Sequence, residues 1–452
     1  MPRPYIPRRV TVISASVGAG HDGAAAELSS RLEAIGFAVD RYDFVDLLPA
    51  GLGRLLSAAY HRLLVLAPAL YQRIYAAMGS TGRPGLLLRP LLRCAERRTL
   101  ATVTPATAAV VSTYPAAGQV LGSLRERGLL RVPVLTYLTD FSVHPLWVAP
   151  GVDAHLAAHA VPAEQARALG ARGVLVAGPV TGARFRPVEE QERRAMRERL
   201  DLPADAVLAL LVAGSWGVGE VRRAAQEIRD GGAAVPVVVC GANRTLLRRL
   251  RADGFAHVRG WESDMPTLMR ACDVLVQNAG GLTSLEAFAT GLPVLSYRCI
   301  PGHGRTNAAA LDVAGLAPWV RSVTELHSKI AELASGALGE RQRSEGLALF
   351  PKGPGPTAVI VAAAGATSGA AQRPYAGGAV RTFRAGGAPA AWAVRIARAS
   401  RVPRPRRTSV LAAGLTLTLG FGVAAPLLDT TGTSVPVRLS LAAHRFLERH
   451  EL

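Results

Sequence analysis

Aromatic residues and cysteines are both scarce in this sequence, and neither kind is spaced as in a known binding motif. Aromatic residues make up 5% of the chain, without the basic–aromatic interleaving that binders of single-stranded nucleic acid use for stacking. The four cysteines, Cys94, Cys240, Cys272 and Cys299, lie far apart and show no metal-site spacing. We expect them to be buried thiols of a reducing compartment. Nucleic acid is not expected as a partner, nor a structural metal.

Acidic residues are also few, 33 against 52 Lys and Arg, which gives a formal net charge of +19. This balance favours a polyanionic partner. With nucleic acid disfavoured, an anionic membrane surface or a phosphorylated substrate remains. The first apolar run, residues 10–17, is short and ends in a glycine loop, so it predicts a strand rather than a secretory signal.

The stretch 273–307 is the most informative one in the chain. It predicts a buried strand at 273–277, a tight glycine turn at 278–281, a helix from Thr283 and a second strand at 293–297. The first N–H groups of such a helix lack partners, so the turn is an anion site. Glu286 lies one helical turn in, where its carboxylate could accept both hydroxyls of a ribose. Thr283 and Glu286 also fit a capping box, which would serve only their own helix.

A strand, a glycine loop and a helix open each half of the chain. The first loop, 18–23, follows a strand at 9–16, and the second loop, 213–219, follows a strand at 207–212. This pattern predicts an α/β protein with two Rossmann-like domains facing across a cleft. The first loop also fits the dinucleotide-binding pattern G-x-G-x-x-G, and Asp40 lies where such folds place the acidic residue that binds the ribose. An NAD-dependent oxidoreductase is therefore an alternative function. The histidine inside this loop and the second glycine loop weaken that alternative.

Two further segments have a distinct composition. Residues 51–78 carry a helical apolar stripe with arginines off it, and Pro68 predicts a kink. This segment predicts either an interfacial helix pair on anionic lipid or an ordinary amphipathic helix facing the core. Residues 351–428 contain no Asp or Glu and ten basic residues, which is typical of a disordered basic tail. The uncharged run near its end predicts a membrane span, a peripheral hairpin or unstructured sequence.

Six stretches, in this order, resemble the diacylglycerol glycosyltransferases of glycosyltransferase family 28, which include monogalactosyldiacylglycerol synthase. They are residues 15–21, 67–75, 137–141, 260–266, 280–286 and 301–307. More distantly, the chain is similar to the bacterial enzyme that adds N-acetylglucosamine to the lipid-linked peptidoglycan precursor. The resemblance covers residues 8–345 and implies a GT-B fold. It also implies inverting transfer of a hexosyl group from a UDP-sugar to a lipid acceptor such as diacylglycerol, with no cofactor and no metal.

The resemblance further implies roles for single residues. His21 corresponds to the histidine proposed as general base in this family. A histidine at the start of a helix suits this role, because the helix dipole keeps its ring neutral. The alternative is a histidine that only caps its loop. Asp140 would join His21 on the acceptor side of the catalytic centre, a helix N-cap being the alternative. The residues implied at the UDP-sugar are Gly20, Ser215, Trp261, Gly280, Gly281, Leu282, Thr283, Glu286, His303 and Asn307. Those implied at the acceptor or the membrane are Arg62, Tyr71, His144 and Trp147.

One departure from the family affects the choice of sugar. Relatives usually place Gln, often followed by acidic residues, where this chain has His303-Gly304-Arg305-Thr306. The sugar therefore stays open between galactose, glucose, N-acetylglucosamine and rarer groups. Two rival functions also stay open. One is a UDP-sugar 2-epimerase, and the other is a catalytically degenerate protein that binds a nucleotide-sugar or a lipid.

These observations predict five regions and a location. The location is the cytoplasmic face of the cell membrane, with peripheral attachment and either no span or one C-terminal span. The regions are an acceptor-side domain at 1–183 that contains the membrane-facing segment 51–78, a UDP-sugar-binding domain at 184–347, a basic disordered linker at 348–408, a transmembrane or interfacial segment at 409–428, and a short tail at 429–452.

Overall fold

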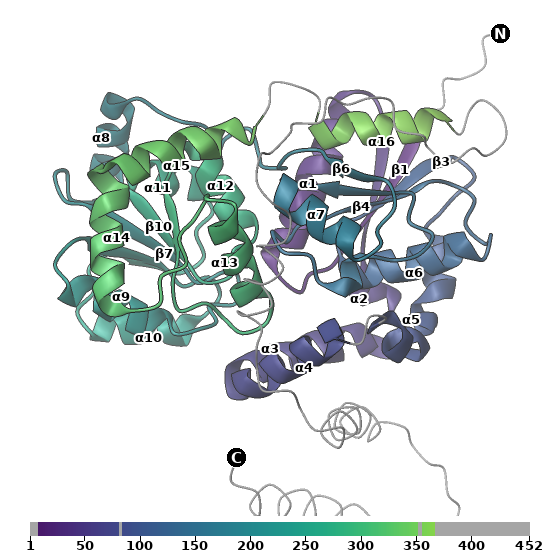
Figure 1. The fold of residues 1–452 in the computed structure, drawn as a ribbon, viewed down its shortest axis with the longest axis horizontal. Helices are drawn as coiled ribbons and strands as arrows, with labels where there is room; N and C mark the ends of the chain where they lie inside the picture. Colours follow the sequence, from purple (N-terminus) through teal and green to yellow (C-terminus); the bar gives the residue numbers. More distant parts are fainter. Residues whose placement is uncertain (1–7, 81–83, 351–354, 367–452) are drawn as a thin grey trace, which may run out of the picture. The chain divides into compact units, whose positions relative to one another are not determined.

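Two parallel sheets organise the computed structural model, which describes residues 8–80, 84–350 and 355–366 (Figure 1). The first sheet has the order β2-β1-β3-β4-β5-β6 and the second the order β11-β10-β7-β8-β9. Each sheet with its helices is called a lobe below. Several strands, such as β1 and β10, are apolar runs buried on both faces, as parallel sheets covered by helices require. The α/β architecture expected from the sequence is confirmed.

The first lobe alternates strands and helices. Its strands are β1 (Arg9–Ser14), β2 (Ala38–Asp43), β3 (Thr107–Ser112), β4 (Val134–Tyr137), β5 (Ala154–Ala157) and β6 (Val174–Val176). Its helices are α1 (Ala19–Ala34), α2 (Phe44–Leu47), the short 3-10 helix η1 (Pro49–Gly51), α3 (Leu52–Leu66), α4 (Pro68–Ser80), α5 (Pro84–Ala101), α6 (Pro115–Glu126), the 3-10 helix η2 (Pro145–Trp147) and α7 (Ala160–Ala168). The kink predicted at Pro68 is a complete break, because α3 ends at Leu66 and α4 begins at Pro68.

The second lobe repeats the pattern. Its strands are β7 (Leu208–Val212), β8 (Val235–Val239), β9 (Val258–Arg259), β10 (Val274–Gln277) and β11 (Val294–Ser296). Its helices are α8 (Glu190–Arg199), α9 (Val221–Asp230), α10 (Arg244–Ala252), α11 (Met265–Ala271), α12 (Leu282–Thr290), α13 (His303–Val313), α14 (Val323–Ser335) and α15 (Ala337–Ala348). Because β10 and β7 are adjacent, the turn after β10 and the glycine loop after β7 meet at one edge of the sheet.

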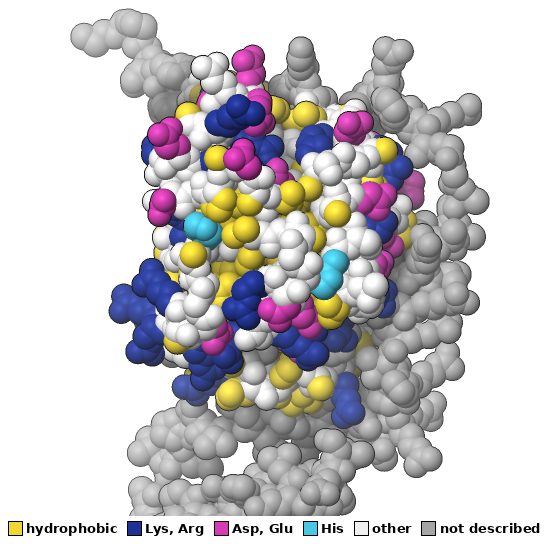
Figure 2. All heavy atoms as spheres, turned by 90° about the vertical axis from the view of Figure 1, so that its left-hand side faces the viewer, with side chains coloured by type: hydrophobic (Ala, Val, Ile, Leu, Met, Phe, Trp, Pro, Cys, Tyr) yellow, Lys and Arg dark blue, Asp and Glu magenta, His cyan; other side chains and the backbone are white. Residues whose placement is uncertain are grey.

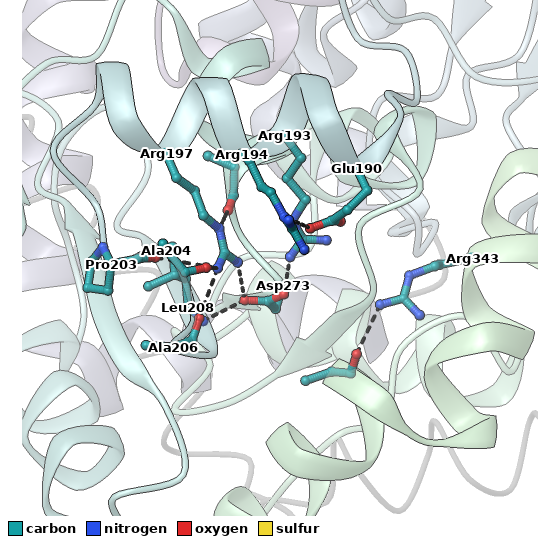
Figure 3. A network of polar contacts seen from close by, with 12 residues as sticks. Glu190, Arg193, Arg194, Arg197, Pro203, Ala204, Ala206, Leu208, Asp273 and Arg343 are labelled. Carbon is teal, nitrogen blue, oxygen red and sulfur yellow. Dashed lines mark hydrogen bonds and ion pairs between the residues drawn. The ribbon is translucent and has the colours of Figure 1, made fainter.

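A buried ion-pair network fixes the start of β10 (Figure 3). The Asp273 carboxylate, just before β10, pairs with Arg193 and, at 2.7 Å, with Arg197 of α8, and it accepts the backbone N–H of Leu208 at 2.7 Å. Arg197 also donates to the backbone oxygens of Ala204 and Ala271. Arg193 and Arg197, both labelled in Figure 3, thus hold α8 against the segments that begin β7 and β10.

The last helix of the described chain, α16 (Gly355–Ala366), belongs to the first lobe (Figure 1). Its Ile360 and Ala364 are fully buried in one cluster with Val10, Leu28 and Val111. The sequence predicted a disordered linker from 348 to 408, and this is wrong over α16. The small side chains of an Ala- and Gly-rich helix let it approach the sheet closely. The same composition is also typical of low-complexity sequence, so the sequence alone did not reveal the helix. The segments predicted at 409–428 and 429–452 lie outside the described residues.

The excess of positive charge is visible on the surface. On the face drawn in Figure 2, Lys and Arg side chains gather toward the lower edge. Helix α10 carries exposed arginines at 244, 248, 249 and 251. None of the helices in the described ranges is long and apolar enough to cross a membrane.

Candidate active site

His21 lies in the first turn of α1 with its ring held from two neighbouring strands. Its Nδ1 is 2.9 Å from the carbonyl oxygen of Thr113, after β3, and 2.8 Å from Oγ1 of Thr139, after β4. A carbonyl oxygen only accepts hydrogen bonds, so Nδ1 carries the hydrogen. In the neutral ring Nε2 is then unprotonated. The loop-capping alternative is wrong, because His21 lies within α1 and its ring bonds to residues that follow β3 and β4.

Aromatic rings enclose the imidazole. Tyr114 meets it edge-on at a centroid distance of 5.2 Å, and Trp147 lies at 5.9 Å. Trp147, which is buried, donates its indole N–H to Oδ2 of Asp140 at 3.1 Å. His21, Trp147 and Asp140 therefore form one contiguous group. The N-cap alternative for Asp140 is wrong, because His144 caps the following 3-10 helix.

Asn307 joins the two lobes instead of facing an open sugar site. Its amide nitrogen donates to Oδ1 of Asp140 at 3.2 Å and to the carbonyl of Ala279 at 3.0 Å. Its oxygen accepts the backbone N–H of Ser142 at 2.7 Å and the hydroxyl of Ser142 at 2.9 Å. The side chain is fully buried. The predicted contact of Asn307 with the donor sugar is therefore not available in this conformation, because all its hydrogen-bonding positions are taken.

The two lobes also meet at the first turns of two helices. Leu282, the first residue of α12, packs on α1: a Cβ added at Gly20 would lie 3.6 Å from Leu282 Cβ. A Cβ at Gly23 would collide with Leu282 Cδ2. Gly20 and Leu282, both predicted at the UDP-sugar, are thus neighbours. The glycines at 20 and 23 permit this approach of α1 to α12.

The turn between β10 and α12 has the geometry of an anion site. Gly280 has a φ of +72°, and no side chain caps α12, whose N-cap is Gly281. A Cβ at Gly281 would meet nothing within 4 Å. The N-terminal amides of α12 therefore begin beside open space.

Glu286 is the best candidate for a nucleotide-binding carboxylate. The helix begins at Leu282, so Thr283 is not its cap, and the capping-box alternative is wrong. Among the described residues no side chain or backbone group bonds the Glu286 carboxylate, and burial raises its pKa to about 8. An enclosed carboxyl without a partner at the edge of a glycine turn is a typical ligand group.

The second glycine loop packs beside this turn. The amide nitrogen of Asn278 donates to the carbonyl of Val218 at 2.9 Å, and a Cβ at Gly219 would lie 2.6 Å from that nitrogen. Ser215 uses its carbonyl to accept the N–H of Ala242 at 2.9 Å. Ser215 thus lies in the predicted loop, at the same sheet edge as Gly280 and Gly281.

Several residues predicted at the acceptor or the membrane have other surroundings. Tyr71 is buried, and its hydroxyl lies 3.3 Å from Nδ1 of His303 in the second lobe. His144 is buried, with Nδ1 accepting from Leu146 N–H and Nε2 3.3 Å from the carbonyl of Tyr75, and burial lowers its pKa to about 4. Arg62 on α3 is exposed, as a membrane contact requires. The membrane role predicted for Tyr71 is wrong, because the ring faces protein.

Two residues predicted at the donor also differ in their settings. Trp261, 65% exposed, lies in the loop after β9 and has no ring contact within the described part of the chain. His303, the first residue of α13, is enclosed by Tyr60 and Tyr71, and burial lowers its pKa. The imidazole of His303 therefore contacts the first lobe at a position where relatives are expected to contact sugar.

A cavity of about 1420 Å³ opens between α3 and the second glycine loop. Its wall includes Ser16 and Asp43 of the first lobe and Trp216, Gly217 and Asn243 of the second. The hydroxyl of Ser16 donates to Asp22, the residue after His21, at 2.8 Å. The cavity is large enough for a polar ligand together with part of a lipid acyl chain.

Sequence reasoning missed three residues that shape the site. Asp22 accepts from Ser14 and Ser16, Thr139 contacts His21, and Gln72 of α4 accepts from the second lobe. Thr139 and Gln72 lie inside stretches that match the family, but only the fold shows what they touch. In the described ranges no group of three or more His, Cys, Asp and Glu side chains is arranged to hold a metal ion.

Comparison with known proteins agrees with this geometry. Residues 22–177 match the model of the monogalactosyldiacylglycerol (MGDG) synthase family. The matched part begins next to His21 and ends after β6, so it covers the first lobe except β1, the first residues of α1, and α16. The resemblance to MGDG synthases seen in the sequence is confirmed.

Curated relatives extend the likeness. The processive diacylglycerol β-glucosyltransferase of Bacillus licheniformis is 27% identical over 243 residues, which are 52% of this chain and 61% of that protein. The protein of the same name from Bacillus subtilis is 27% identical over 239 residues, 51% of this chain and 60% of that protein. The chain therefore matches about three fifths of the length of these relatives.

Solved structures confirm the GT-B fold. The Medicago truncatula protein UGT71G1, complexed with UDP-glucose, superposes with a TM-score of 0.52 at 13% identity, covering 80% of this chain and 99% of that one. A UDP-glucosyltransferase from Polygonum tinctorium gives 0.50 at 14% identity, covering 81% and 100%. At these identities the likeness concerns the fold alone.

Proposed function

We propose that this protein is an inverting glycosyltransferase that moves a hexosyl group from a UDP-sugar to a lipid acceptor such as diacylglycerol. The match to the MGDG synthase model and the names of the Bacillus relatives support the reaction class. The observation that carries the proposal is the imidazole of His21, anchored through Nδ1 with Nε2 unprotonated in the neutral ring.

His21 acts as the general base in this mechanism. The carbonyl of Thr113 fixes the tautomer, and together with the hydroxyl of Thr139 it holds the plane of the ring, so Nε2 can take a proton from an acceptor hydroxyl. The acceptor oxygen then forms its bond to the anomeric carbon while the bond from that carbon to the UDP oxygen breaks on the opposite face. The electron pair of the broken bond leaves with UDP, and the configuration inverts.

The departing UDP is stabilised by the glycine turn and the start of α12. Unpaired amides at a helix N-terminus favour the negative charge that grows on the diphosphate. Glu286 accepts the ribose hydroxyls, and this gives its enclosed carboxylate the partners it otherwise lacks. We propose that this arrangement needs no metal ion.

Asp140 has a positioning role in this scheme. Its two oxygens accept from Trp147 and Asn307, so it holds an aromatic wall beside His21 and ties the first lobe to the second. With both oxygens engaged, it is poorly placed to transfer a proton itself.

We further propose peripheral attachment to the cytoplasmic face of the cell membrane through α3 and α4. Leu55, Val65, Leu66 and Leu70 of this pair are exposed large hydrophobic residues. Arg54, Arg62 and Arg73 are exposed on the same two helices, where they would meet anionic headgroups. All four cysteines are free thiols, and a reducing compartment would keep them so. Cys240 and Cys272 are buried as expected, whereas Cys299 is half-buried and Cys94 is exposed, so the expectation of four buried thiols is wrong.

The test is a transfer assay on the full chain. Vesicles containing diacylglycerol are offered with UDP-glucose, UDP-galactose or UDP-N-acetylglucosamine, and lipids and nucleotides are analysed by mass spectrometry. We expect a glycosylated lipid and an equal amount of UDP with at least one donor. An isomerised UDP-sugar without glycolipid would indicate an epimerase instead, and neither product would indicate a binding protein.

A further inference from the structure

Helix α4 touches the backbone of the second lobe at one glycine. Gln72 Oε1 accepts the N–H of Gly302 at 2.8 Å, and both residues are buried. Gly302 has a φ of +67°, and a Cβ there would lie 2.6 Å from Cε1 of Tyr71. Only glycine combines this backbone conformation with so close an approach to a ring. Tyr71 and Gln72 therefore fix the position of the turn that begins α13.

The same turn packs against the predicted diphosphate site. The N–H of Ile300 donates to the carbonyl of Asn278 at 2.9 Å, and a Cβ at Gly304 would lie 2.7 Å from that oxygen. A Cβ at Gly280 would lie 2.7 Å from Cβ of Asn307. Because these backbones touch without intervening side chains, a shift at Gly302 displaces the 278–280 turn as well.

Tyrosines extend this contact along the helix pair. The hydroxyls of Tyr60 on α3 and Tyr71 on α4 lie 3.5 Å and 3.3 Å from Nδ1 of His303. Tyr75 lies 3.3 Å from the hydroxyl of Thr306. One face of the α3–α4 pair therefore contacts Gly302, His303 and Thr306. On the same helices Leu55, Val65, Leu66 and Leu70 are exposed.

We propose that Tyr71 and Gln72 are positioning residues for the donor, and that through them contact of α3–α4 with a bilayer is linked to UDP-sugar affinity. This inference rests on the proposed function. A bilayer that orders the helix pair also orders the turn at Gly302. Binding of the UDP-sugar then loses less conformational entropy, and its affinity rises. By thermodynamic reciprocity, bound nucleotide strengthens the contact with the bilayer to the same degree.

The test measures UDP affinity of the full chain by calorimetry, with and without vesicles of phosphatidylcholine and phosphatidylglycerol. We expect vesicles to tighten UDP binding at least about fivefold in the unchanged protein. Gln72→Leu should lose this gain and raise KM for the UDP-sugar more than it lowers kcat. Gln72→Glu should retain the gain, because a carboxylate oxygen also accepts the Gly302 N–H.

Gln342→Leu is the matched control. Gln342 is also buried and accepts a backbone N–H, that of Val294, at 3.0 Å. It lies on α15, which is well apart from α4 (Figure 1). The change should cost stability and leave the vesicle effect unchanged. If Gln72→Leu does not fold, Tyr71→Phe, which keeps the ring over Gly302 and removes only the hydroxyl near His303, should reduce the vesicle effect.

The outcomes separate the two proposals. If the unchanged protein binds no UDP with or without vesicles, the proposed function fails. If it binds UDP equally well in both conditions, or if Gln72→Leu retains the full vesicle effect, the linkage is overturned and the proposed function stands.

Discussion

Ser142 of the first lobe donates its backbone N–H to Oδ1 of Asn307 in the second lobe at 2.7 Å, and its hydroxyl reaches the same oxygen at 2.9 Å. Asn307 in turn donates to Asp140. One buried amide thus links the group around His21 to the turn at Ala279.

Replacing this amide should destabilise the protein. Asn307→Ala would leave the N–H of Ser142 and a carboxylate oxygen of Asp140 without their partner, at a cost of about 2 kcal/mol in the free energy of unfolding. Asn307→Asp should cost more, because it places a second carboxylate against Asp140. Urea denaturation monitored by fluorescence measures both. Equal stability of all three proteins would show that the link contributes nothing.

Removing the base should affect turnover and not nucleotide binding. His21→Ala is expected to lower kcat by about a hundredfold or more, since it removes the imidazole that we propose takes the acceptor proton. UDP affinity, measured by calorimetry, should change little because Glu286 and the 280–283 turn are untouched. A variant with unchanged turnover would exclude His21 from the mechanism.

Glu286 should make stability depend on pH. Its pKa rises from 4.5 to about 8 on folding because burial disfavours the carboxylate. The folded state therefore binds more protons between these values, and the free energy of unfolding should fall as pH rises from about 4.5 to 8. Glu286→Gln should remove this slope and leave the variant more stable than the unchanged protein at pH 9 without nucleotide. Parallel pH profiles of the two proteins would contradict the assignment.

The ion pairs at the start of β10 should matter more than surface pairs. Asp273→Ala leaves Arg197, whose side chain is 7% exposed, without its carboxylate, and should cost about 3–5 kcal/mol. Asp230→Ala, which removes an exposed partner of Arg229, is the control and should cost less than about 1 kcal/mol. Thermal unfolding of the two variants gives the comparison. Similar losses would mean that burial of the network is irrelevant.

The exposed apolar residues at the end of α3 should govern vesicle binding. Val65 and Leu66 are 52% and 78% exposed, so a double change to serine should leave folding intact while weakening co-sedimentation with anionic vesicles severalfold. Leu129→Ser, at a residue 53% exposed in the loop before β4, is the control and should bind like the unchanged protein. Identical binding by all three would place the membrane contact elsewhere.

Local pattern was sufficient for the elements around the glycine turn between β10 and α12. The apolar run of β10, the paired glycines and the helix after them follow from residue type and spacing, and Pro68 was correctly expected to interrupt its helix. The anchoring of His21 by Thr113 and Thr139 was not predictable, because it depends on β3 and β4 being neighbours in the sheet.

Contacts between lobes were the other limit. Tyr71 and Asn307 were assigned to ligands because a sequence does not tell which side chains are used by protein neighbours. Only the folded structure shows that the Tyr71 ring packs on Gly302 and that the Asn307 amide is bonded to Ser142 and Asp140.

Helix α16 has a consequence for how the polypeptide reaches this fold during synthesis. Its Ile360 and Ala364 complete a cluster built on Val10 and Leu28, although the whole second lobe intervenes in sequence. On the ribosome the first lobe emerges early, yet its core stays open until the second lobe and residue 366 have left the exit tunnel. A chaperone that shields this gap in the nascent chain would then raise the yield of full-length protein, and fragments that stop at 350 would aggregate.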